Sequence, residues 1–286
     1  MALKVLSWNI NGLKAKLEQK YELLSLFADY DVVLLQETRV GEADWDEITE
    51  AFKGPYNIKP VTGLNCTMYV KKKKTMYLTS FSSSRKGVAI IINKTHMRLK
   101  AFCDGGDFAW ISVEIASQWY TFVSVYYNAK DDDLICDLML KLFYSFITKR
   151  LDLDKCRPVI GGNFNTTLCD LDVKEQNKAH GPRRNRLNEF ISIVQLSDVW
   201  RVMADGGEGY TYSCGNPMSR LDYIFMLNRH MDRVQSCEIL NDIHQSDHFP
   251  LTLTLKMNEN DVENLASNLE QVNVSCGRAE ESKDSP

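Results

Sequence analysis

Gly161-Gly162-Asn163-Phe164-Asn165 is the stretch that decides the fold class, because it directly follows the apolar run Pro158-Val159-Ile160. A buried strand that stops at paired glycines and then presents short polar side chains is how a sheet delivers catalytic groups to its carboxyl edge. Gly and Asn are also the commonest residues of turns, so an ordinary turn is the alternative interpretation. The rest of the chain has to decide between the two.

The composition is that of a globular protein with a large core. The chain has 286 residues, of which 44% are hydrophobic and 10% aromatic, enough for one large α/β domain or two small ones. It has no run of eighteen apolar residues, and its first residues turn polar too soon for a signal peptide, so we expect an intracellular protein without membrane spans. The net charge of −4 means that any contact with a polyanion must be local.

The eight cysteines are scattered along the chain, and no two of them form a CxxC pair. This distribution fits reduced intracellular thiols better than a zinc site or a disulfide framework. We therefore expect small buried side chains rather than metal ligands at these positions.

Apolar periodicity predicts strands and helices that alternate along the chain. Strands are expected at residues 4–8, 32–35, 88–92, 110–115, 121–126, 158–160 and 251–255. Helical spacing predicts helices at about 14–28, at 135–146 and at 187–194. Two further strands, 209–213 and 221–225, are expected to pair around the loop 214–218. We take residues 1–256 as one domain, whereas the polar composition of 257–286 predicts a disordered tail.

Several of these strands end in, or lie beside, a carboxylate, an amide or a histidine. The residues concerned are Asn9, Asn11, Glu37, Asn163, Asn165, Asp222, Asp247 and His248. Hydrolysis of a phosphodiester needs carboxylates for a hard divalent cation, a general base near a water molecule, and donors for the phosphoryl oxygens. The set can supply at least two of these. Taken singly, a carboxylate at a strand end is commonly just solvated, and a lone histidine is commonly structural.

Six motifs in chain order resemble the endonuclease/exonuclease/phosphatase superfamily, which includes exonuclease III, the apurinic/apyrimidinic endonucleases and the endonucleases of LINE-type retrotransposons. The motifs lie at residues 7–13, 34–38, 125–126, 161–165, 219–223 and 246–250. The LINE-type branch looks most similar, through residues 157–168 and 210–213. The resemblance implies a four-layered α/β sandwich, in which two packed β-sheets are flanked by helices. It also implies a monomeric nuclease that binds DNA, and hence a nuclear location.

The resemblance further implies Mg²⁺-dependent hydrolysis of DNA phosphodiester bonds, with Mn²⁺ as a possible substitute. Glu37 would bind the cation with help from Asn9, Asn11 and Asp247. Tyr126 would support the scissile phosphate, and Asn165 would orient it. Asp222 would orient the imidazole of His248, which would polarise a phosphoryl oxygen or assist the attacking water.

Three positions depart from the pattern of the resembled family. One is Asn128, which follows Tyr126 one residue closer than the corresponding asparagine of the family and is therefore given no role. Asn163 stands where the family has an aspartate, and an amide cannot accept a proton. If the role of that aspartate is general base, turnover should fall by roughly 10²–10⁴ or more. The alternative is therefore a catalytically impaired relative that still binds nucleic acid. Ser219 stands where the repair enzymes place a tryptophan against the abasic sugar, so we expect nicking of intact DNA. A member acting on phospholipids or inositol phosphates fits the motifs less well.

A basic cluster follows the central stretch and could bind DNA. It consists of Lys174, Lys178, His180, Arg183, Arg184 and Arg186. Such a cluster suits phosphate contacts without reading of base sequence, although a solvated loop and helix start is the alternative. We assign DNA contacts to Arg183, Arg184, Arg186 and Ser219, and the loop 214–218 could enter a groove.

Overall fold

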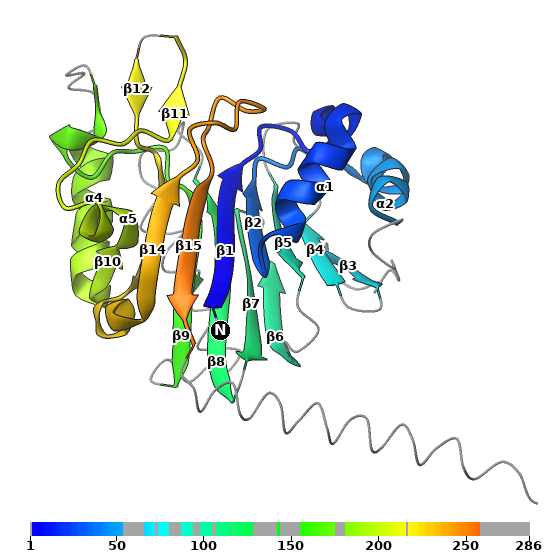
Figure 1. The fold of residues 1–286 in the computed structure, drawn as a ribbon, viewed down its shortest axis with the longest axis horizontal. Helices are drawn as coiled ribbons and strands as arrows, with labels where there is room; N and C mark the ends of the chain where they lie inside the picture. Colours follow the sequence, from blue (N-terminus) through cyan, green and yellow to red (C-terminus); the bar gives the residue numbers. More distant parts are fainter. Residues whose placement is uncertain are drawn as a thin grey trace, which may run out of the picture.

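Two mixed β-sheets packed face to face form the body of the protein in the computed structural model, and helices cover their outer faces (Figure 1). The structure describes residues 2–53, 66–71, 74–79, 87–93, 98–104, 107–115, 117–127, 142–143, 155–174, 181–215 and 217–257.

The first sheet has the N-terminal strand in its interior. Its order among the described strands is β14-β15-β1-β2-β5-β4-β3. These strands span Val234–Ile239 (β14), Leu251–Lys256 (β15), Ala2–Asn9 (β1), Val32–Gln36 (β2), Val88–Ile92 (β5), Lys74–Thr79 (β4) and Cys66–Lys71 (β3). β1 runs parallel to β2 and antiparallel to β15. The two ends of the described chain are therefore neighbours in one sheet.

The second sheet contains the glycine pair Gly161-Gly162. Its order among the described strands is β10-β13-β9-β8-β7-β6. These strands span Leu196–Asp198 (β10), Asp222–Leu227 (β13), Cys156–Asn163 (β9), Gln118–Tyr126 (β8), Phe108–Ile115 (β7) and Arg98–Asp104 (β6). β8 and β9 are parallel, and the other described pairs are antiparallel.

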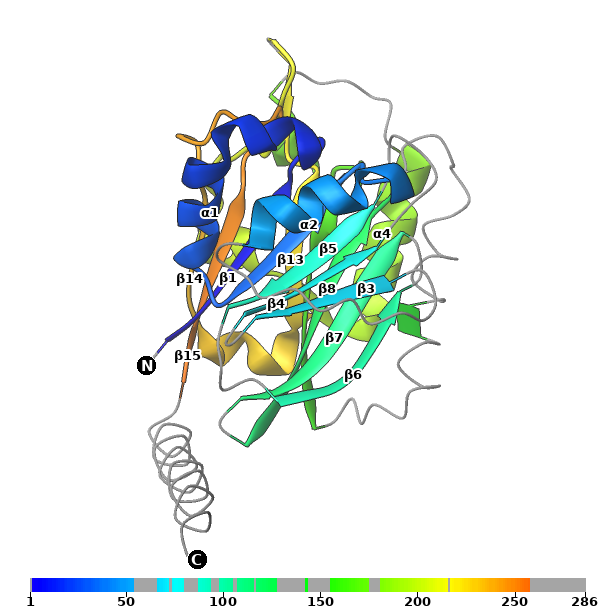
Figure 2. The ribbon, with the colours of Figure 1, turned by 90° about the vertical axis from the view of Figure 1, so that its right-hand side faces the viewer.

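Three apolar clusters produce the layers. One lies between the sheets, because alternate residues such as Val5, Leu34 and Phe122 point inward from both of them. A second joins the outer face of the first sheet to α1 (Lys20–Ala28) and α2 (Trp45–Lys53). A third joins the outer face of the second sheet to α4 (Gly181–Val194). Figure 2 shows this arrangement from the side, and it confirms the predicted four-layered α/β sandwich.

The paired glycines do not end their strand, contrary to the sequence-based expectation, but lie inside β9. A Cβ on Gly161 would lie 2.8 Å from Ser7 Oγ and from Leu34 Cδ1 of the facing sheet. A Cβ on Gly162 would lie 2.0 Å from the carbonyl oxygen of Val125 on the neighbouring strand. The glycines are therefore needed for close approach of backbones and sheets, not for a turn.

The predicted pairing of 209–213 with 221–225 is wrong. Instead, β11 (Tyr212–Ser213) pairs with β12 (Met218–Ser219) in a small ribbon that projects beyond the sheets in Figure 1, while β13 pairs with β9 and β10. The predicted helix at 14–28 begins with a 3-10 segment, η1 (Lys14–Gln19). Further 3-10 turns are η2 (Glu42–Asp44), η3 (Asp170–Asp172) and η4 (Asn228–Arg233), and the short helix α5 spans Val199–Met203.

Some predictions fall outside the described residues. They are the helix at 135–146, apart from the helical residues 142 and 143, and the tail beyond Met257, whose own side chain still packs into the core between the sheets. None of the described helices combines the length and the apolar composition needed to cross a membrane.

Candidate active site

Three predicted site residues form a row across the second sheet. Tyr126 at the end of β8 is in register with Asn163 at the end of β9, and Asn163 is in register with Asp222 at the start of β13. All three side chains are buried. Because residues in register on adjacent strands share a face, the row presents a phenol, an amide and a carboxylate side by side.

The first sheet contributes Asn9 and Glu37 at the ends of β1 and β2. Asn9 Nδ2 donates to Glu37 Oε1 at 2.9 Å, and Asn9 Oδ1 accepts the backbone N–H of Asn11 at 3.1 Å. Asn11 and Glu37 have positive φ angles of 50° and 48°, an uncommon conformation for a glutamate. The backbone N–H of Gly12 stabilises this conformation of Glu37 by donating to the carbonyl oxygen of Glu37 at 2.8 Å.

Arg39 is a site residue that the sequence analysis missed. Its Nη2 lies 2.7 Å from Glu37 Oε2, so both oxygens of that carboxylate already have donors. The sequence does contain a signal for this role, because Arg39 is a basic residue two positions after the predicted ligand Glu37, at the end of the same strand.

Asp222 and His248 form the predicted acid–imidazole pair. Nδ1 of His248 lies 2.7 Å from Asp222 Oδ2, and both side chains are buried. Backbone N–H of Asp222 donates to Thr211 Oγ1 at 3.0 Å, and Trp8 Nε1 donates to the His248 carbonyl at 2.9 Å, which fixes both partners. Burial opposes the charged imidazolium, but the carboxylate of Asp222 outweighs it and raises the pKa of His248.

Asp247 and Ser246 connect this pair to the first sheet. Asn11 Nδ2 donates to Asp247 Oδ1 at 2.7 Å, and Ser246 Oγ donates to the carbonyl of Asn9 at 2.8 Å. The backbone N–H of His248 donates in turn to Ser246 Oγ at 3.2 Å. The segment before β15 is thus hydrogen-bonded to the end of β1.

Tyr126 brings the two sheets together at this edge. Burial and the neighbouring carboxylate of Glu37 raise the pKa of Tyr126, whereas Arg39 and a hydrogen bond with Asn165 act in the opposite direction. The phenol therefore stays protonated at neutral pH and can donate a hydrogen bond.

Asn163 and Asn165 form a local turn at the end of β9. Asn163 Oδ1 accepts the backbone N–H of Asn165 at 2.8 Å, and Asn165 Nδ2 donates to the carbonyl of Tyr127 at 2.6 Å. Asn165 has a φ of 47°, which asparagine tolerates better than most residues. Asn163 Nδ2 is buried and has no partner in the described part of the chain.

The residues at this edge fit a hard divalent cation by donor type. Glu37 and Asp247 supply carboxylate oxygens, and the buried Oδ1 of Asn11 has no hydrogen-bond partner among the described residues. Mg²⁺ prefers such oxygen ligands. The described residues hold no cluster of three or more His, Cys, Asp or Glu that could bind a metal ion by themselves.

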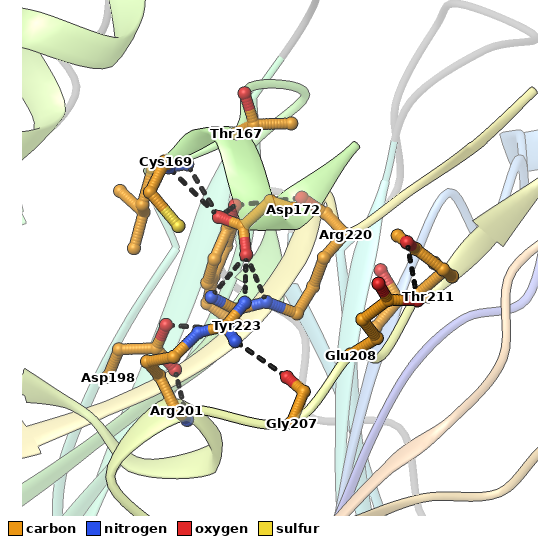
Figure 3. Close-up of polar contacts among 12 residues, drawn as sticks. Thr167, Cys169, Asp172, Asp198, Arg201, Gly207, Glu208, Thr211, Arg220 and Tyr223 are labelled. Carbon is orange, nitrogen blue, oxygen red and sulfur yellow. Dashed lines mark hydrogen bonds and ion pairs between the residues drawn. The ribbon is translucent and has the colours of Figure 1, made fainter. Parts of the chain in front are cut away.

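A buried ionic network around Asp172, drawn in Figure 3, was not predicted from the sequence. Asp172 accepts from Arg220 Nε at 2.9 Å and from Arg201 Nη2 at 2.5 Å, and Arg220 also pairs with Asp198 at 2.6 Å. The hydroxyl of Tyr223 donates to the carbonyl of Arg220 at 2.8 Å. The network joins the loop after β9 to the segment that leads into Asp222.

Of the predicted DNA-binding cluster, Lys178 and His180 lie outside the described residues. Arg183 and Arg186 are half-buried in the first turns of α4. Arg184 donates to Thr167 Oγ1 at 2.8 Å and pairs with Asp170, so it is already held within the chain. Ser219 lies half-buried in β12, at the base of the ribbon. Their contacts with DNA stay predictions.

The fold and this edge define an α/β-sandwich protein with a hydrolase-like polar centre, built from both sheets. The chain belongs to the Endonuclease/Exonuclease/phosphatase family, whose model matches residues 6–248. That match covers both halves of the site.

Named relatives agree with this membership. The chain is 23% identical over 279 residues to an exodeoxyribonuclease of Bacillus subtilis, covering 89% of this chain and all of the relative. It is also 23% identical to recombination repair protein 1 of Drosophila melanogaster over 88% of this chain, but it spans only 37% of that protein.

Solved structures share the fold at low identity. The AP endonuclease LMAP of Leishmania major has a TM-score of 0.66 with 17% identity, and the match covers 90% of this chain and 88% of that one. The catalytic domain of Xenopus laevis APE2 has a TM-score of 0.65 with 21% identity, and the match covers 90% and 94%.

Proposed function

We propose that the protein hydrolyses phosphodiester bonds of DNA with Mg²⁺ or Mn²⁺, and that it does so slowly because of Asn163. The observation that carries this proposal is the buried Asp222–His248 pair, which shares one edge of the sandwich with Glu37 and Tyr126. The family supports phosphodiester chemistry, and the names of the relatives support DNA as the substrate.

Each side chain has a role that follows from its protonation and contacts. Glu37, Asn11 and Asp247 would hold the cation, which would supply positive charge against the phosphate. Tyr126, protonated because its pKa is raised, would donate to a phosphoryl oxygen. His248 has Nδ1 committed to Asp222, which leaves Nε2 as the nitrogen that would face the substrate.

Asn163 sets the rate in this proposal. Its side chain cannot accept a proton from water, and its Oδ1 is already occupied by the backbone N–H of Asn165. A catalytically impaired protein that binds nucleic acid is therefore the second candidate. Nicking of intact DNA, as in LINE-type enzymes, and cleavage at abasic sites are both open to test. A nuclear location would follow if chromosomal DNA is the substrate.

A nicking assay with Asn163→Asp tests the function. The two residues have nearly the same shape, so the variant should fold while gaining a carboxylate beside the predicted cation ligands. We expect slow nicking of supercoiled plasmid in Mg²⁺ by the native chain and a rate at least about 10²-fold higher for the variant. Plasmid with and without abasic sites distinguishes the two DNA substrates.

The controls make the outcome decisive. His248→Asn on the Asn163→Asp background should remove the gain, and EDTA should stop both proteins. Rapid nicking by the native chain would show that another group activates the water. Two inactive proteins that still bind DNA would favour the impaired relative.

A further inference from the structure

We propose that this site binds a nucleic-acid phosphodiester without a divalent cation, using the amide of Asn163 as a hydrogen-bond donor and the guanidinium of Arg39 as a fixed positive charge. This inference rests on the proposed function, because it concerns the same site, and it specifies how that site holds its substrate.

The first observation is the unpaired amide of Asn163. Its side chain is 0% exposed, and its Oδ1 is fixed as an acceptor because the backbone N–H of Asn165 points at it from 2.8 Å. Nδ2 is consequently left without a partner among the described residues. Buried donors are almost always paired in native proteins, so this one calls for a ligand. A phosphoryl oxygen would satisfy it, whereas an ionised aspartate at this position would have no hydrogen to donate.

The second observation is the ion pair between Arg39 and Glu37. The guanidinium lies 2.7 Å from the carboxylate, and both residues have positive φ angles, of 52° and 48°. Such angles cost free energy in these residue types and persist only where the surroundings impose them. Here the N–H of Gly12 donates to the Glu37 carbonyl and the N–H of Thr38 donates to the Gly87 carbonyl. The backbone is therefore held at Glu37 and Thr38, and the ion pair with Glu37 holds the guanidinium at the site.

With Asn163, the site has one negative charge fewer than it would have with an aspartate at this position. This difference favours the binding of an anion. Arg39 offsets the charge of Glu37. Of the other two carboxylates of the site, Asp222 is hydrogen-bonded to the ring of His248 and Asp247 is exposed. A carboxylate in place of the Asn163 amide would add a negative charge in a buried position, where little water screens its repulsion of a phosphate. A divalent cation would then be needed to offset it.

Binding of a short fluorescent DNA duplex, followed by anisotropy in EDTA and in Mg²⁺, tests this inference. We expect the native chain to bind with a Kd in EDTA within about threefold of its Kd in Mg²⁺. Asn163→Asp should weaken binding in EDTA by about tenfold or more, the effect of losing one hydrogen bond to a charged group, and Mg²⁺ should recover part of it. Asn163→Ala should lose the donor without adding repulsion, so it should weaken binding less. Arg39→Gln should weaken binding in EDTA, whereas Arg39→Lys should retain most of it.

Asn228→Asp is the matched control. It makes the same change of charge at the exposed first residue of η4, which follows β13. Asn228 lies about 20 Å from Asp222 at the usual rise of a strand, so the variant should leave both Kd values unchanged. Melting curves show whether each variant is folded. Native binding that requires Mg²⁺, or equal Kd values for Asn163→Asp and the native chain in EDTA, overturns the inference and leaves the nuclease proposal standing. No DNA binding in either buffer would overturn both.

Discussion

Glu37 is the residue on which cation binding should depend, because it is the carboxylate hydrogen-bonded to both Asn9 and Arg39 at the ends of β1 and β2. A cation that binds the native state and not the unfolded chain raises the melting temperature by mass action. Glu37→Gln keeps the shape of the side chain and removes its charge. We expect this variant to lose most of the rise in melting temperature that Mg²⁺ causes in the native chain.

Differential scanning fluorimetry in EDTA and in Mg²⁺ measures this effect. Glu18→Gln is the matched control, since Glu18 is exposed on η1, and its shift should equal that of the native chain. The same Mg²⁺-induced shift in Glu37→Gln as in the native chain would exclude Glu37 as the principal ligand.

The sequence predicted which residues carry the functional groups of the candidate site, but not which atoms these groups contact. The motifs identified Asn9, Glu37, Asp222 and His248, and the structure brings them to one edge. The orientation of these groups depends on bonds such as Trp8 Nε1 to the His248 carbonyl, which join residues 240 positions apart. Local patterns carry no information about such distant partners.

At the scale of elements, the buried network around Asp172 connects η3 with the segment that enters β13. Removing one partner of a buried ion pair leaves the other charges uncompensated. We expect Asp172→Asn to lower the free energy of unfolding by about 3–5 kcal/mol, measured by urea denaturation. Asp170→Asn, two residues away, is the matched control: its side chain is 83% exposed, and such ion pairs contribute little.

The stabilisation by Asp172 should also depend on pH. Burial favours the neutral acid, but Arg220, the backbone N–H of Leu168 and Arg201 together outweigh it and lower the pKa of Asp172. A carboxyl with a lowered folded-state pKa contributes stability above its unfolded pKa of about 3.9 and loses it as the pH falls through the folded value. The difference in unfolding free energy between the native chain and Asp172→Asn should therefore be constant above about pH 5 and shrink below about pH 4. A difference that does not change with pH would contradict this account.

Elements with a clear period could be predicted, whereas irregular or short ones could not. The central strands β1, β2, β5 and β15 are apolar enough to be identified within a few residues. β14 was missed because a register shift between Val234 and Ser236 interrupts its alternation. The glycines of β9 were misread as a strand end, since the sequence does not show that Ser7 and Leu34 of the other sheet lie against Gly161.

At the scale of the whole molecule, DNA binding should depend on salt, because the overall charge is negative and contacts with phosphate must come from local basic groups. We expect neutralisation of Arg183, Arg184 and Arg186 to weaken binding to all DNA sequences about equally. Each phosphate contact that is lost should remove about 0.9 from the slope of log K against log salt on B-DNA.

Titrations of the native chain and the triple variant at several salt concentrations measure that slope. Because Arg184 also holds Thr167 and Asp170, a double variant at Arg183 and Arg186 serves as a check that the loop is intact. An unchanged slope in both variants would mean that these arginines do not contact DNA phosphates, but face solvent or stabilise the fold.

The pairing of β1 with β15 places residues 2–9 beside residues 251–256. During translation β1 is made about 250 residues before β15, which is the separation along the chain between paired residues such as Ala2 and Lys256. Contacts so distant along the chain fold slowly, and unpaired strand edges are exposed to aggregation in the meantime. His248 of the candidate site lies three residues before β15, so its pairing with Asp222 forms only after this last described strand of the sheet begins to be made. The polar edge that the two sheets share is therefore incomplete on the ribosome until synthesis has passed β15.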